Sequence, residues 1–168
     1  MSIRTLGAAD AEAYRALMLE AYGAYPQAFT SSVAERAAMP LSWWEKRLES
    51  ALDCLLGVHV DAELAGIVGL AFEPREKARH KVTLFGMYVS GAHQQQGLGR
   101  QLVEAALDEA RRHPRLKVIQ LTVTAGNAAA FALYQRCGFI QYGLEPLAVR
   151  VGEDYFDKIH MWRELKTG

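Results

Sequence analysis

The segment from residue 82 to residue 124 constrains the fold more than any other part of the chain. Val82–Val89 has the apolar and β-branched content of a strand, and a glycine-containing loop, Gly91–Gly99, then leads into a helical pattern. The apolar positions of that helix recur with helical spacing, and Pro114 prevents its continuation. Lys117–Thr124 follows as a strand buried on both faces. Because a crossover helix joins strands that run in the same direction, this segment predicts one parallel strand pair.

The N-terminal third predicts a short strand followed mainly by helices. Ser2–Leu6 is the expected strand, and Asp10 stands where it would cap a helix that ends near Gly23. Two later segments, Ser32-x-x-Glu35 and Ser42-x-x-Glu45, have the capping-box spacing, and the second is expected to open another helix.

The remaining segments complete a mostly antiparallel sheet. Leu55–Val60 and Leu64–Phe72 read as a hairpin, and Phe139–Leu144 and Tyr155–Leu165 read as two last strands joined by a loop. No repeat, linker or charge block divides the chain, so residues 1–168 are expected to form a single domain. We therefore predict an α/β (α+β) fold, with a mixed, mostly antiparallel central sheet of about six or seven strands flanked by about four helices.

Composition and charge narrow the possible ligands and partners. The 19 basic and 19 acidic residues cancel, so no overall field attracts nucleic acid or an anionic membrane. The longest uncharged apolar run, Leu64–Phe72, is far shorter than the ~20 residues of a membrane span, and the first residues lack the hydrophobic region of a signal peptide. Cys54 and Cys137 form no CxxC pair, and the five histidines show no metal-ligand spacing. We expect a cytoplasmic protein without a metal, in which any phosphate-bearing ligand is held locally.

The loop Gln94–Arg100 carries the strongest functional signal. Glycines before a helix let the backbone approach a ligand closely, and free N–H groups at a helix N-terminus favour an anion such as a pyrophosphate. A dinucleotide fingerprint fails here, because Leu102 stands where a third small residue is needed and Lys117 and Val118 stand where the acidic residue is needed. A P-loop pattern is absent.

Two motifs in the chain resemble those of the GNAT superfamily of N-acetyltransferases. Gln94–Gly99 has the pattern Q-x-x-G-x-G of the superfamily's acetyl-CoA loop, and Asn127–Phe139 is similar to its N-x-x-A-x-x-L-Y-x-x-x-G-F segment. The run Gly152–Met161 also resembles a stretch found before the last strand of small bacterial members. The resemblance implies acetyl-CoA as co-substrate, and a parallel strand pair that is splayed at the cofactor site.

The resemblance assigns roles to individual residues. Backbone groups of Met87 and Val89 would bind the acetyl and pantetheine portion, and Tyr134 would protonate the departing thiolate. Asn127 is expected to cap its helix, to bind the cofactor, or to do both. The cofactor-binding residues implied are Met87, Tyr88, Val89, Gln94, Gln95, Gln96, Gly97, Leu98, Gly99, Arg100, Asn127 and Tyr134.

The general base and the acceptor site are less constrained by the sequence. Many relatives carry a glutamate on the strand matching Val82–Val89, whereas this strand has no acidic residue. We predict His80 as the base, with Glu73, Asp154 or a water chain as alternatives. Acceptor recognition is expected from Tyr25 and Phe29, with Trp43 or Trp44, and from Asp154 and Tyr155.

These residues predict direct transfer of an acetyl group from acetyl-CoA to a primary amine. The acceptor is expected to be a small molecule or the N-terminus of a peptide or protein. The alternative is a non-catalytic acyl-CoA sensor or interaction module on the same fold. The resemblance also implies a homodimer formed through the last strands.

Overall fold

Seven strands form one sheet in the computed structural model, which describes residues 1–166. The strand order is β1-β2-β3-β4-β5-β7-β6, and all neighbouring strands are antiparallel except β4 and β5, which are parallel. The predicted fold class is confirmed. The elements are β1 (Ser2–Thr5), α1 (Ala11–Ala24), α2 (Val33–Ala37), α3 (Leu41–Glu49), β2 (Asp53–Val60), β3 (Glu63–Phe72), β4 (Lys81–Val89), α4 (Leu98–Arg111), β5 (Val118–Thr124), α5 (Ala128–Arg136), β6 (Ile140–Val151) and β7 (Asp154–Glu164).

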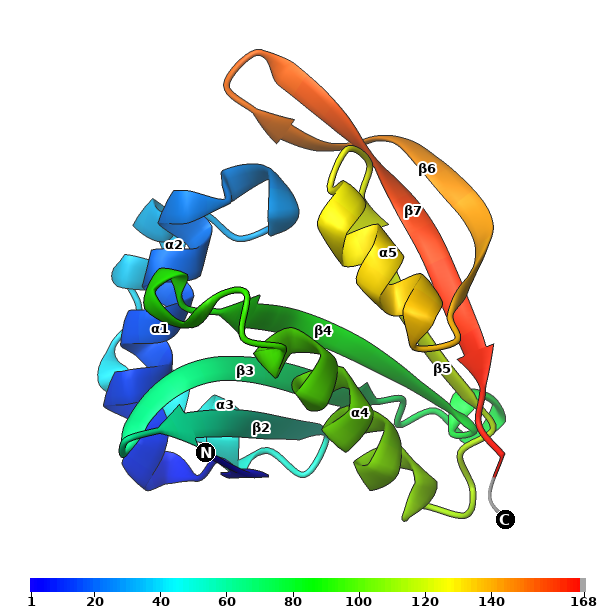
Figure 1. Ribbon diagram of the computed structural model, residues 1–168, viewed down its shortest axis with the longest axis horizontal. Coiled ribbons are helices and arrows are strands. Elements are labelled where there is room, and N and C mark those ends of the chain that lie inside the picture. The colour runs from blue at the N-terminus through cyan, green and yellow to red at the C-terminus, as the bar shows by residue number, and fades with distance from the viewer. Residues whose placement is uncertain (167–168) are drawn as a thin grey trace.

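The parallel pair β4–β5 separates soon after it forms. Only three residue pairs are in register, ending at Thr83 and Gln120, whose side chains share a hydrogen bond of 3.2 Å from Gln120 Nε2 to Thr83 Oγ1. Figure 1 shows the two strands diverging from there. Beyond Thr83, no residue of β4 is in register with one of β5 in residues 1–166. The predicted splay is therefore present.

A β-bulge in β4 changes which side chains face each side of the sheet. Phe85 lies opposite Gly69 and Tyr88 lies opposite Ile67, so Gly86 and Met87 together face a single residue of β3. Gly86 has φ +62°, a left-handed conformation that glycine adopts at little cost. Because of the bulge, Phe85 and Tyr88 both face the side covered by α1 and α3, whereas Met87 faces α4.

Two apolar cores lie on opposite faces of the sheet. The larger contains α4, whose predicted apolar stripe is buried: Leu98, Leu102, Val103, Ala106, Leu107 and Ala110. The smaller contains α1 and α3, with Trp44 fully buried between them and the sheet. None of the helices in the described part of the chain is long and apolar enough to cross a membrane.

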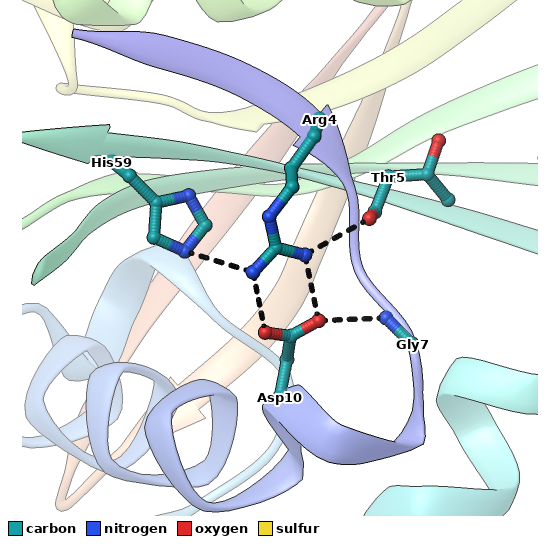
Figure 2. A network of polar contacts seen from close by, with 5 residues as sticks. All are labelled: Arg4, Thr5, Gly7, Asp10 and His59. Carbon is teal, nitrogen blue, oxygen red and sulfur yellow. Dashed lines mark hydrogen bonds and ion pairs between the residues drawn. The ribbon is translucent and has the colours of Figure 1, made fainter. Parts of the chain in front are cut away.

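Asp10 does not cap α1 as predicted. Its carboxylate turns back, pairing with Arg4 at 2.8 and 2.9 Å and accepting a hydrogen bond of 2.8 Å from the Gly7 N–H (Figure 2). His59 Nε2 lies 3.5 Å from the Arg4 guanidinium. The hydrogen bond from Arg4 lowers the pKa of Asp10 to about 2 despite partial burial. The network thus ties β1 to the start of α1.

Two further expectations about element boundaries are wrong. The helix α3 begins at Leu41 after Pro40, so the Ser42–Glu45 spacing is not a capping box, although the Ser32–Glu35 box is confirmed. The loop predicted after Leu144 is instead strand, because β6 continues to Val151 through an irregular stretch in which Leu147 has φ +50°. Pro146 and its neighbours mark this bulge rather than the end of the strand.

Candidate active site

A cleft of about 920 Å³ opens where β4 and β5 diverge. Its walls come from β4, β5, the N-terminus of α4, the inner side of α5, and the end of α1 with residues 25–31. The α4 side and the α1 side meet along the free edge of β4, so a ligand in the cleft can touch both faces of the sheet.

The loop before α4 presents backbone N–H groups to this cleft. Gln95 has φ +65° and Gly97, the N-cap residue of α4, has φ +76°. Within the described residues, no backbone N–H from Gln95 to Arg100 has an acceptor. These free donors, together with the positive end of the helix dipole, suit a diphosphate. A Cβ on Gly99 would lie 3.4 Å from Leu133, so glycine also allows α4 to approach α5.

The side chains around this loop are placed differently from expectation. Gln94 donates from Nε2 to the carbonyl of Val89 at 3.0 Å and to the Tyr25 hydroxyl at 3.3 Å, so it braces the end of β4. Arg100 points away from the cleft and pairs with Glu104 at 2.9 Å. Gln96 does not line the cleft, whereas Gln95, Gly97, Leu98 and Gly99 do.

The end of β4 supplies the strand edge that the sequence predicted. Met87, Tyr88 and Val89 all line the cleft. The Tyr88 hydroxyl donates to Glu20 Oε2 at 2.6 Å, and burial followed by that hydrogen bond raises the pKa of Tyr88. The Tyr88 side chain therefore fastens β4 to α1, which leaves its backbone as the part that faces a ligand along the strand edge.

Tyr134 lies in the wall of the cleft on α5. The residue is only 7% exposed, and its ring contacts Phe139 edge to face with centroids 5.9 Å apart. Its hydroxyl has no hydrogen-bond partner among residues 1–166 and faces a cleft that it lines. Burial raises the pKa of Tyr134. The phenol is therefore held neutral over the working pH range, as a proton donor must be.

Asn127 has the capping role that was expected for it. Its Oδ1 accepts a hydrogen bond of 3.2 Å from the Ala130 N–H at the start of α5, and the residue also lines the cleft. Tyr25 and Phe29 also line the cleft, where both rings pack on Tyr88 with centroids 6.0 and 6.5 Å away.

Several predicted residues lie elsewhere. His80 precedes β4 at the opposite end from Val89, roughly 25 to 30 Å along the strand. Asp154 and Tyr155 begin β7 at an exposed hairpin and do not line the cleft. Trp44 is fully buried in the smaller core, and Glu73 pairs with Arg75 on the surface. The structure does not bring these side chains to the cleft.

The charged lining of the cleft was not predicted from the sequence. Arg36 of α2, Arg47 of α3 and Lys158 of β7 line it, and no aspartate or glutamate of the described residues does. These cations come from three separate elements without a shared motif, so only the fold shows that they line one space.

The sheet splays at its parallel pair, and a loop with free backbone N–H groups and a helix N-terminus lie in the gap, an arrangement suited to a diphosphate. The sequence model of the acetyltransferase (GNAT) family matches residues 13–139. The chain belongs to this family.

Several known proteins are similar to this chain in sequence or in fold. The ribosomal protein bS18 alanine N-acetyltransferase of Escherichia coli is 41% identical over 69 residues, which are 41% of this chain and 46% of that relative. The chain thus matches less than half the length of that relative. The L-methionine sulfoximine/L-methionine sulfone acetyltransferase of Pseudomonas paraeruginosa is 28% identical over 98% of this chain and 90% of its own. A GNAT acetyltransferase structure from Streptococcus pneumoniae superposes with a TM-score of 0.84 at 26% identity, covering 97% of this chain and 98% of that one.

Proposed function

We propose that this protein transfers an acetyl group from acetyl-CoA directly to a primary amine. The observation that carries the proposal is that one cleft is lined both by the loop with unpaired N–H groups before α4 and by Tyr134 of α5, next to the free edge of β4. A ligand with a diphosphate at one end and a reactive acyl group at the other fits this arrangement.

The residues have separable roles in the proposed reaction. The N–H groups from Gln95 to Arg100 hold the diphosphate, and backbone groups of Met87 and Val89 align the pantetheine and acetyl portion. Bound acetyl-CoA supplies an activated acyl group as its thioester. Tyr134 donates its proton, or a hydrogen bond, to the sulfur as the thiolate leaves.

The cleft offers no carboxylate to deprotonate the acceptor, within residues 1–166. The α-amine of a peptide N-terminus has a pKa near ~8 and is partly neutral at physiological pH, whereas a lysine-type amine has one near ~10.4. This contrast supports an acceptor amine of low pKa, deprotonated through water. The relatives include an enzyme named for an alanine of a ribosomal protein and one named for L-methionine sulfoximine and L-methionine sulfone, which are amino-acid derivatives.

Calorimetry followed by a turnover assay tests the proposal. We expect acetyl-CoA to bind, and thiol release in the same preparation to depend on an added amine from a panel of peptides and small molecules. Binding without release from any acceptor would favour the non-catalytic acyl-CoA sensor. Absence of binding would refute the role given to the loop before α4.

The resemblance also leads us to propose a homodimer through β6, the edge strand of the sheet. Ile140, Tyr142 and Leu144 are each more than half exposed on this strand, although they are large and apolar. Sedimentation velocity of the wild type and of Leu144→Glu is expected to show a dimer and a monomer, respectively. A monomeric wild type would contradict this proposal.

A further inference from the structure

We infer that the acceptor amine carries a carboxylate, and that Arg47 binds it. The acceptor would be a free α-amino acid or a similar compound, rather than a polyamine or an internal amine of a peptide. The inference rests on the proposed function, because it names the chemistry of the acceptor in that reaction.

The charge balance of the cleft is the first observation. Arg36, Arg47 and Lys158 line it, no aspartate or glutamate of residues 1–166 does, and none of the three forms an ion pair within those residues. Glu145 lies opposite Lys158 in the β6–β7 ladder, but its carboxylate pairs with His160 at 2.9 Å. The whole protein has a formal net charge of zero, so this local excess is not a consequence of a basic composition. A polycationic acceptor would be repelled here, whereas an anionic group would be attracted.

Arg47 is held in place in a way that suits an anion. Its guanidinium carbon lies 4.9 Å from the centroid of the Phe85 ring and 5.9 Å from that of Trp43. Its Nε is buried and has no hydrogen-bond partner among residues 1–166. A partly desolvated guanidinium without a counter-charge is unfavourable, and a carboxylate in the cleft would compensate it.

Arg36 reinforces the same surface. Its guanidinium carbon lies 4.5 Å from the centroid of the Trp43 ring, so one indole supports both arginines, and its Nε donates to Ser31 Oγ at 3.1 Å. Stacking on an aromatic ring limits the motion of a guanidinium and leaves its N–H edge free for a planar carboxylate.

The arginines lie on the wrong side of the sheet to bind the phosphates of acetyl-CoA. The loop before α4, which is proposed to hold the diphosphate, leads into the helix that covers the face with the larger core. Arg47 lies on α3, which covers the opposite face together with Phe85. A ligand that binds Arg47 thus occupies the part of the cleft on the face opposite α4, away from the loop that is proposed to hold the diphosphate.

Lys158 extends this surface to the other wall. It stands opposite Thr124 in the β5–β7 ladder, and its Nζ donates to Thr30 Oγ1 at 2.9 Å. The Thr124 hydroxyl donates to the Gln27 carbonyl at 2.8 Å, which fixes residues 27–30 against this wall. The three cations therefore surround the acceptor side of the cleft from α2, α3 and β7.

A matched panel of acceptors tests the inference. Thiol release would be measured with free α-amino acids, with their carboxamides, and with putrescine, using the wild type, Arg47→Gln, Arg47→Lys and the control Arg112→Gln on the exposed end of α4. We expect at least one amino acid to exceed its carboxamide by about 10- to 100-fold in kcat/KM, the range set by a charged hydrogen bond. Arg47→Gln should raise KM for the acid by a similar factor and leave the carboxamide unchanged, and Arg47→Lys should recover part of the loss.

Product binding separates this inference from the proposed function. The dissociation constants of N-acetyl amino acids and of their carboxamides would be measured by calorimetry on the protein saturated with CoA. If the N-acetyl amino acids bind more tightly than their carboxamides, and Arg47→Gln abolishes this preference, the carboxylate site is supported. This holds even if no amine releases thiol, because the lack of thiol release refutes only the proposed transferase activity. Equal binding of every acid and its carboxamide would overturn the inference, as would a loss of kcat in Arg47→Gln that is the same for acids and carboxamides.

Discussion

Replacing Tyr134 by Phe removes one hydroxyl from the wall of the cleft and leaves the ring in place. The hydroxyl has no partner among the described residues, and the contact between the ring and Phe139 at 5.9 Å does not involve it. We therefore expect the free energy of unfolding to change by no more than about 0.5 kcal/mol. Acetyl-CoA binding should also be retained, because the substitution does not change the loop before α4.

The expected effect on catalysis follows from the protonation of this phenol. Its pKa is raised by burial, so transfer of its proton to a thiolate with a conjugate acid near ~8.5 is uphill. Its contribution is therefore mainly a hydrogen bond to developing negative charge, of about 1.5 to 3 kcal/mol. The Tyr134→Phe variant should consequently lose about 10²-fold in kcat.

Thiol release at saturating acetyl-CoA, with calorimetry and thermal unfolding on the same samples, measures this effect. The matched control is Tyr142→Phe, which removes a hydroxyl from an exposed residue of β6 outside the cleft and should leave kcat unchanged. A fall in kcat of less than threefold, with binding intact, would refute the role of Tyr134 as the donor to sulfur.

Three further predictions concern the loop before α4, the ion pair between Arg4 and Asp10, and the pKa of the acceptor amine. Gly97→Ala should lower the free energy of unfolding by about 1 kcal/mol, because Gly97 has φ +76°, which strains an alanine even though its Cβ would meet no other atom. The same variant should bind acetyl-CoA roughly tenfold more weakly in calorimetry, and unchanged affinity would contradict the role of the loop before α4 in binding the diphosphate. Asp10→Asn should cost about 1 kcal/mol at pH 7, after allowance for the half-exposed Arg4, in urea unfolding. Because the folded pKa of Asp10 is lowered to about 2, that difference should persist above pH 5 and disappear as the pH falls from 4 through 2; a difference that does not depend on pH would contradict the ion pair. Finally, kcat/KM should rise with pH up to the pKa of the acceptor amine. When acceptors of different pKa are compared, the midpoint of this rise should shift with the pKa of the acceptor. One midpoint shared by all acceptors would instead indicate a base on the protein.

The strand, loop and helix that form one side of the cleft could be predicted from the sequence because their signals are local. The strand, glycine loop and amphipathic helix between residues 82 and 111 are consecutive, and each has a period or turn residue that specifies it. The bulge at Gly86 could not be predicted in this way, since a glycine within a strand does not show whether the ladder shifts there. Its effect, placing Phe85 and Tyr88 on the same side, depends on pairing with β3.

Tyr25 and Phe29 were predicted to lie near the site and line the cleft, but the cationic side of the cleft could not be predicted, because its residues meet only through long-range packing. Arg36, Arg47 and Lys158 look like ordinary surface cations on their own elements, and nothing in their spacing relates them. His80 shows the opposite case. It is next to β4 in the sequence, yet it precedes the end of β4 that is far from Val89, and it does not line the cleft. Asp154, predicted for acceptor recognition, lies on the exposed β6–β7 hairpin, whereas the charged residues that line the cleft are cations.

The lack of an acidic residue in the lining of the cleft, among residues 1–166, and the excess of cations there act in the same direction on a bound amine. One uncompensated cation about 7 Å from a bound ammonium, at an effective dielectric constant of about 20, disfavours that ammonium by about 2.4 kcal/mol. This energy corresponds to a fall of about 1.7 in the pKa of the amine, which increases the fraction of the bound amine that is neutral at a given pH. If Arg47 is occupied by the acceptor's carboxylate, Arg36 and Lys158 remain to act on the amine. The same positive surface can therefore select an acidic acceptor and deliver its amine in the neutral form that attacks the thioester.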